Sequence, residues 1–114
     1  MEDLDVDQEL TRAALPQAVL AVLSHGESHG YAIAEVLRRH GFARIKGGTL
    51  YPLLKRLEDH GFVKHTWQHD QAGPGRKQFT LTEQGSDELA RTAAAWQRMS
   101  QALTEIRTTR QEQS

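Results

Sequence analysis

The clearest periodicity in the chain is a leucine face followed by a glycine. The leucines recur at positions i, i+3, i+4 and i+7, the spacing of one helix face, and are Leu50, Leu53, Leu54 and Leu57. Because a proline costs little only in the first turn of a helix, Pro52 predicts a helix that begins near Gly48 or Thr49 and continues to about residue 60. Gly61 is the expected stop of that helix.

An earlier helix is predicted to begin at Pro16, whose missing N–H would have no partner in a first turn. Its broad apolar surface consists of Val19, Leu20, Val22 and Leu23. Gly26 is the expected stop. Residues 1–11 are acidic and only weakly periodic, so the pattern leaves open an N-terminal arm or a short helix that packs on a partner through Leu4 and Leu10.

A second helix is predicted over residues 28–40, with Ser28 as its N-cap. Three apolar residues share one face at helical spacing, namely Ile33, Val36 and Leu37. Gly41 should end this helix, and Phe42 is placed to fold back onto its last turn.

Two strands are predicted after the leucine helix, over residues 62–69 and 77–82. Apolar and polar residues alternate in both, and the apolar members are Val63, Trp67, Phe79 and Leu81. Residues 71–76, with the sequence Gln-Ala-Gly-Pro-Gly-Arg, are expected to connect the strands as a loop. The pattern therefore predicts a hairpin with a glycine-proline-glycine tip.

A long helix is predicted last, with Thr82 as its cap, from about Glu83 to Arg107 or beyond. Its apolar residues follow a heptad seam, with Thr92 as a weak point, and are Leu89, Trp96, Met99, Leu103 and Ile106. Three short helices cannot bury a seam of this length. We therefore expect a homodimer in which this helix meets the same helix of a second copy.

The charge of the chain is unevenly distributed, although the formal net charge is only −1. Residues 36–80 contain nine cations and three acids, or +6, whereas the remainder contains five cations and twelve acids, or −7. A basic middle between acidic ends is typical of a module that contacts nucleic acid and carries a separate structural part.

Composition excludes several classes of protein. The chain has no cysteine, which excludes a disulfide framework and fits a reducing cytoplasm. Its longest apolar runs are far shorter than a membrane span, and its start is acidic, unlike a signal peptide. We therefore expect a cytoplasmic protein with no membrane partner.

The six histidines do not form a convincing metal site. His25 and His29 are separated by a predicted helix break, and His65 and His69 lie too far apart along a strand to share one metal. The chain shows no constellation of nucleophile, base and orienting group, and no phosphate-binding glycine loop. We expect no metal, no cofactor and no enzyme activity.

The order helix, helix, helix, strand, strand, long helix predicts a mainly α winged helix-turn-helix fold of the α+β type. We divide it into an arm or short helix over residues 1–14, a DNA-binding domain over residues 15–82 and a dimerisation helix over residues 83–114. In such a fold the third helix enters the major groove of DNA. Four of its residues can then reach phosphates or base edges, namely Thr49, Tyr51, Lys55 and Arg56. Arg76 and Lys77 would contact DNA from the hairpin.

Three motifs show a family resemblance. They are His29-Gly30-Tyr31-Ala32-Ile33, the run from Gly48 to Glu58 with Gly61 following, and the run from Gly75 to Thr82 with Gly85 after it. In this order and spacing the chain resembles the PadR-type transcriptional regulators of bacteria over about residues 15–90. The single helix after the hairpin resembles the branch of that family with a short C-terminal part.

The resemblance implies a winged-helix domain, a C-terminal dimerisation helix and a repressor of near-palindromic double-stranded DNA that is released by a small molecule or other signal. Carried over by position, the residues of the DNA face are Tyr31, Thr49, Tyr51, Pro52 and Lys55, with Arg76 and Lys77 on the wing. Gln78 and Phe79 depart from the family, which usually has tyrosines there, and the departure removes a hydroxyl from the wing.

Trp96 has two interpretations. A large aromatic side chain at a heptad position usually fills the seam, which is the simpler interpretation. Some short family members instead bind flat aromatic compounds between such tryptophans, and the candidate lining here is Leu15, Val19, Ala93, Trp96 and Met99. Two other functions therefore stay open beside the repressor: a winged-helix module that binds protein without DNA, and a multidrug sensor that acts through a pocket at Trp96.

Overall fold

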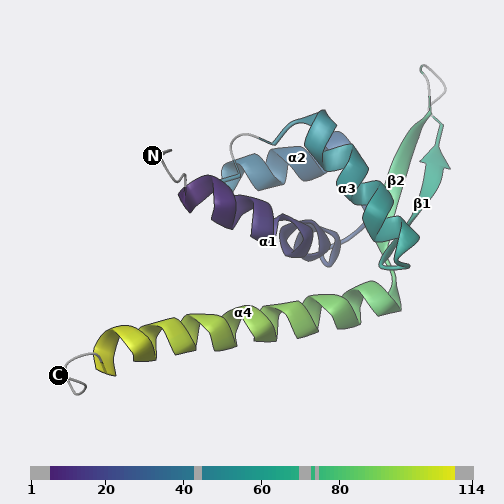
Figure 1. Ribbon diagram of the computed structural model, residues 1–114. Coiled ribbons are helices and arrows are strands. Elements are labelled where there is room, and N and C mark those ends of the chain that lie inside the picture. The colour runs from purple at the N-terminus through teal and green to yellow at the C-terminus, as the bar shows by residue number, and fades with distance from the viewer. Residues whose placement is uncertain (1–5, 43–44, 70–72, 74, 110–114) are drawn as a thin grey trace.

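The computed structural model describes residues 6–42, 45–69, 73 and 75–109. Over these residues the element order is the one that the apolar pattern predicts (Figure 1). The elements are α1 (Val6–Leu23), α2 (Gly30–Arg39), α3 (Gly47–Asp59), β1 (Val63–Gln68), β2 (Arg76–Leu81) and α4 (Glu83–Thr109).

The core lies between α1, α2 and α3 and is closed by the base of the hairpin. Its most deeply buried large side chains are Val19, Leu20, Ile33, Leu37, Leu50, Leu54 and Val63. All four leucines of the α3 face are buried, as their spacing predicted. Phe42 packs against this core after a turn in which its N–H donates to the Leu37 carbonyl at 2.9 Å. Burial of the leucine face fixes which side of α3 meets solvent.

The hairpin is a two-stranded antiparallel sheet in which Val63 lies opposite Leu81 and Trp67 lies opposite Lys77. At its base β2 also pairs with the segment between α1 and α2. The Ser28 N–H donates to the Phe79 carbonyl at 3.0 Å, and the Phe79 N–H donates to the Ser28 carbonyl at 2.7 Å. These bonds attach the hairpin to the helical part of the molecule, while strands β1 and β2 extend away from α4 (Figure 1).

Helix α4 begins on the turn between α3 and β1. The Thr82 hydroxyl donates to the Gly61 carbonyl at 2.6 Å and accepts from the Gly85 N–H at 3.0 Å, which confirms Thr82 as the cap. The helix then runs back beneath α1 and ends near the side of the molecule where α1 begins (Figure 1). Leu89 packs against the core of its own chain, so its burial does not require a second copy of the protein.

One predicted helix start and the placement of one proline are wrong. Helix α1 begins at Val6, ten residues before Pro16, so Pro16 lies inside the helix and the helix crosses the domain boundary placed after residue 14. Helix α3 begins at Gly47, within one residue of the predicted start, but Pro52 lies beyond its first turn. A proline inside a helix removes one N–H donor, and the packing of the apolar faces around Leu20 and Leu54 outweighs that loss.

Ser28 is not the N-cap of α2. The cap is His29, whose ring Nδ1 accepts from the Ala32 N–H at 3.4 Å, because the backbone of Ser28 is already committed to the bridge with Phe79. Gly41 ends α2 with a φ of 99°, as predicted.

The hairpin also differs from prediction in two places. Trp67, an apolar member of the predicted alternation, lies on the same face of the hairpin as Val63, but it is 55% exposed because the strands extend beyond the helices. Arg76, expected in the loop, is the first residue of β2. Several expectations lie outside the described residues: the first five residues of the N-terminal segment with Leu4, most of the hairpin tip (70–72 and 74) and the end of the chain after residue 109.

Three packed helices followed by an antiparallel hairpin define a winged helix-turn-helix, in which the hairpin is the wing. The predicted fold class is therefore confirmed, and α4 is appended to it. Among the described residues, no helix has both the length and the apolar character needed to cross a membrane.

We predict that Gly85→Ala lowers the free energy of unfolding by about 1–3 kcal/mol, the usual cost of forcing extra atoms into a packed site. A Cβ at Gly85 would overlap the carbonyl group of Phe62, on which α4 is seated. The control is Gly48→Ala, where a Cβ meets nothing within 4 Å and the helix gains from alanine. Thermal unfolding should shift in opposite directions, and equal shifts would contradict the close seating of α4.

Candidate nucleic-acid interface

The side of α3 opposite its leucines carries the residues that the sequence assigned to DNA. All five of them are exposed: Thr49, Tyr51, Pro52, Lys55 and Arg56. Tyr31 at the start of α2 is also exposed, at 65%. Tyr31, Thr49 and Tyr51 lie in the first turns of α2 and α3, which meet where the Tyr51 ring lies against Gly30, whereas Arg56 lies in the last turn of α3. Their contact with DNA is not tested by the single chain and stays a prediction.

Tyr51 joins α3 to α2. Its ring lies against Gly30, so close that a Cβ at Gly30 would collide with the ring and its hydroxyl. The ring is still half exposed. Gly30 therefore leaves room for the Tyr51 ring between the two helices, a role that its place in the His29–Ile33 motif did not reveal.

The beginning of α3 has backbone N–H groups that point outward from the helix. Within the described residues, the N-cap residue Lys46 makes no side-chain hydrogen bond to the helix start. The N–H groups of the first helical turn therefore have no side-chain cap, and the helix dipole adds partial positive charge at the same place. An anion is favoured at such a helix start.

Lys55 faces outward but has an acidic partner on its own helix. Its Nζ lies 2.9 Å from Oδ1 of Asp59, one turn later, and both side chains are more than half exposed. The hydrogen bond to Asp59 and the charge of that carboxylate raise the pKa of Lys55 above its ordinary value, with a smaller contribution from Glu58 and an opposing one from burial. A phosphate that binds Lys55 must therefore compete with the carboxylate of Asp59.

The two wing cations lie on opposite faces of the hairpin, because successive residues of a strand alternate. Lys77 shares the core-side face with its cross-strand partner Trp67, and its Nζ lies 5.9 Å from the centre of the Trp67 ring. Arg76 points to the other face and is exposed. One duplex in contact with one face of the wing therefore cannot meet Arg76 and Lys77 in the same way.

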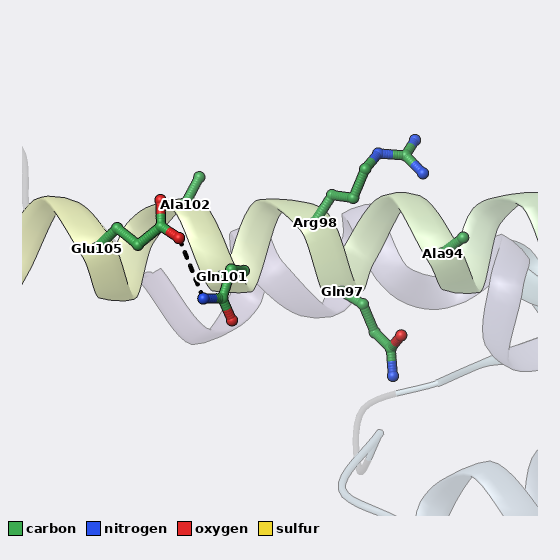
Figure 2. Close-up of a pocket in the computed structure, with 6 residues that line it drawn as sticks. All are labelled: Ala94, Gln97, Arg98, Gln101, Ala102 and Glu105. Carbon is green, nitrogen blue, oxygen red and sulfur yellow. Dashed lines mark hydrogen bonds between the residues drawn. The ribbon is translucent and has the colours of Figure 1, made fainter.

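The candidate pocket residues are not brought together on an open surface of the single chain. Leu15 and Val19 belong to the buried core, Ala93 and Trp96 are half-buried, and Met99 is 57% exposed. A shallow, open pocket lies along one side of α4 and is lined by Ala94, Gln97, Arg98, Gln101, Ala102 and Glu105 (Figure 2). All six lining residues come from that one helix, and none belongs to the predicted set.

The seam of α4 is largely uncovered beyond Trp96. Met99, Leu103 and Ile106 are all more than half exposed, and Ile106 reaches 67%. On the neighbouring α1, Val6 and Leu10 are exposed in the same way. The described part of the chain contains no group of three or more histidine, cysteine or acidic residues placed to hold a metal ion.

A winged helix-turn-helix with a polar, cation-bearing face on its third helix is a class of fold found in DNA-binding regulators. Residues 19–91 match the model of the transcriptional regulator PadR-like family, and the chain belongs to this family. The family resemblance drawn from the three sequence motifs is confirmed.

Two curated relatives are transcriptional regulators. The chain is 32% identical over 96 residues to transcriptional regulator Rv3488 of Mycobacterium tuberculosis, a match that covers 84% of this chain and 88% of that protein. It is 34% identical over 77 residues to the negative transcriptional regulator PadR of Bacillus subtilis, covering 66% of this chain and 42% of that protein. The match thus spans less than half of the Bacillus subtilis regulator. These relatives are not enzymes, which confirms the expectation that this chain is not one.

Solved structures show the same fold. A PadR-like regulator of Bacillus cereus matches with a TM-score of 0.76 and 26% identity, covering 86% of this chain and 95% of that one. A PadR family regulator of Eggerthella lenta matches with a TM-score of 0.76 and 33% identity, covering 87% and 82%. Bacillus subtilis PadR, solved with operator DNA, matches with a TM-score of 0.64 and 32% identity, covering 69% and 46%.

We predict that Asp59→Ala lowers the pKa of Lys55 toward its ordinary value, because the carboxylate that stabilises the ammonium is removed. The sign follows from the direction of the shift: Lys55 gains stability as a cation in the folded protein, and this gain is lost as pH rises through its raised pKa. An NMR titration of the Lys55 side chain measures the change. An unchanged pKa would mean that the ion pair does not persist in solution.

Proposed function

We propose that this chain is a dimeric, sequence-specific DNA-binding regulator that represses transcription and is released by a small molecule or other signal. The observation that carries the proposal is the orientation of α3. Its leucine face is buried, and its outward face therefore presents Tyr51, Lys55 and Arg56 to solvent beside a basic wing. Support also comes from the relative solved with operator DNA, which shares this fold.

The contacts with DNA divide by type. The uncapped start of α3 with Thr49 and Tyr51 is suited to phosphate, and phosphate contacts fix the position of a protein on the duplex. Lys55, Pro52 and Arg56 lie farther along the outward face, where side chains reach base edges in the major groove. Tyr31 would contact the backbone from α2, and Arg76 or Lys77 from the wing. We place the protein in the bacterial cytoplasm, the compartment that contains the DNA.

The dimer follows from the uncovered seam of α4. One copy leaves Met99, Leu103 and Ile106 exposed, and a second copy related by a two-fold axis would bury them together with the exposed part of Trp96, while Leu89 already packs on the core of its own chain. Two copies of α3 would then lie about one DNA turn apart, roughly 34 Å, so the operator should be nearly palindromic.

Release would act through the same seam. Trp96 is half-buried, and in a dimer it would meet or face its counterpart, with Leu15, Val19 and Ala93 as the other residues of the proposed site. A planar aromatic effector seated there would change the spacing of the two α4 helices, and with it the spacing of the two α3 helices.

Lys55→Ala combined with Arg76→Ala should weaken binding to the operator and reduce its dependence on salt. Each lost phosphate contact lowers the slope of log K against log salt by about 1. Fluorescence anisotropy at several salt concentrations, with a duplex selected by the wild-type protein from random DNA, measures both quantities. The control is Arg107→Ala, which removes a cation from the last turn of α4. A double variant that binds like wild type with the same slope would refute this DNA face.

Leu103→Glu should separate the dimer, because it places a charge in a seam where burial of a leucine contributes about 1.5–3 kcal/mol per copy. Sedimentation velocity measures the oligomeric state. Gln101→Glu is the matched control, since helical geometry puts residue 101 on nearly the opposite side of α4, where Gln101 lines the pocket in Figure 2. Loss of the dimer in the control alone would show that the other face of α4 forms the interface.

A further inference from the structure

One hydrogen bond joins the C-terminal part of α3 directly to the wing. Nδ1 of His65 in β1 lies 2.5 Å from Oε2 of Glu58 in α3, and both side chains are about one quarter exposed. Glu58 lies on the same flank of α3 as Tyr51 and Lys55, since the three are spaced by four and three residues. Along this flank Glu58 contacts the wing through His65, whereas Tyr51 at the other end lies against Gly30 of α2.

His65 connects the core to the outer part of the wing. Its ring lies 6.2 Å from the ring of its cross-strand partner Phe79, which is buried, and 6.4 Å edge-on from the ring of Trp67. The three aromatic residues lie on the same face of the hairpin. Among the described contacts, His65 is the outermost residue of that face that bonds to another element.

Beyond His65 the wing is supported mainly by its own side chains. Trp67 is exposed, stacks on His69 at 6.4 Å between ring centres, and carries the Lys77 ammonium above its ring at 5.9 Å. A two-stranded hairpin alone is marginally stable in water. The position of Lys77 relative to α3 therefore depends on how firmly His65 is held.

We propose that Glu58, His65 and Trp67 form a brace that positions Lys77 beside the DNA-binding face of α3, so that an acidic residue of this helix promotes DNA binding. The inference rests on the proposed function. Glu58 and His65 act as positioning residues: Glu58 holds His65, His65 supports Trp67, and Trp67 carries the cation.

Charge alone gives the opposite expectation, which makes the brace testable. A carboxylate near a phosphate backbone repels it, so removal of an acid from α3 should strengthen binding to DNA. Asp59 is the neighbouring acid on the same helix, and it is paired with Lys55 and has no bond to the wing among the described contacts. Glu58 and Asp59 are thus a matched pair with equal charge and different contacts.

The experiment compares Glu58→Ala with Asp59→Ala by fluorescence anisotropy, with a duplex selected by the wild-type protein. Glu58→Ala should weaken binding about 3- to 10-fold, the range for one lost hydrogen bond, and lower the salt slope by about 1. Asp59→Ala should bind as tightly as wild type or more tightly. If both variants strengthen binding alike, charge explains the result and the brace is refuted.

Two further variants separate positioning from a general structural loss. Glu58→Gln keeps an oxygen that accepts from His65 and removes the charge, so it should restore at least wild-type affinity. In a Lys77→Ala background, Glu58→Ala should have almost no additional effect, since the cation that the brace positions is absent. A full additional effect in that background would overturn the assignment of Lys77.

A measurement without DNA keeps the brace distinct from the proposed function. In a Trp96→Phe protein, Trp67 is the remaining tryptophan. Its quenching by acrylamide should increase with Glu58→Ala and stay unchanged with Asp59→Ala. Increased quenching in a protein that binds no duplex would reject the regulator and keep the brace, whereas unchanged quenching would reject the brace whatever the DNA result.

Discussion

Burial of the leucine face of α3 is the interaction on which the rest of the structure depends. Leu50, Leu53, Leu54 and Leu57 are all buried against α1 and α2. Because a helix has one rotation about its axis that satisfies this face, the same packing decides which residues remain outside. Lys55 and Arg56 are presented outward as a consequence of where the leucines go. The DNA-binding face that we propose is therefore a product of core packing and needs no separate scaffold.

The wing depends on the core only at its base. The Ser28–Phe79 bridge and the buried ring of Phe79 hold the first part of the hairpin, and the Glu58–His65 bond continues the attachment toward α3. Farther along, the two strands extend beyond the helices, and for this reason Trp67 is exposed while Val63 is buried. Alternation along the strands also separates Arg76 from Lys77. A basic pair in the sequence thus becomes two cations with different surroundings.

Helix α4 has two parts with different requirements. Its first turns are seated on the Gly61–Phe62 turn by Thr82 and Gly85, and Leu89 joins the core. Its later turns expose Met99, Leu103 and Ile106. An exposed apolar stripe of this kind is costly for a single copy, since the burial of each such side chain is worth a few kcal/mol. This cost is the physical reason for proposing a two-fold partner, and it links the spacing of two DNA-binding faces to the packing of α4.

The sequence by itself determined the elements with strong periodicity and clear ends: the leucine face of α3, the stops at Gly41 and Gly61, the cap at Thr82 and the order of the six elements. These features follow from local rules, because spacing and backbone preference act within a few residues. The start of α1, the cap of α2, the exposure of Trp67 and the pairs Lys55–Asp59 and Glu58–His65 were decided by the tertiary structure. The packing of its apolar face keeps α1 helical on both sides of Pro16. Because the backbone of Ser28 pairs with Phe79, His29 and not Ser28 is the N-cap of α2. His65 meets Glu58 only because the hairpin folds back along α3, a contact between elements that no local pattern contains.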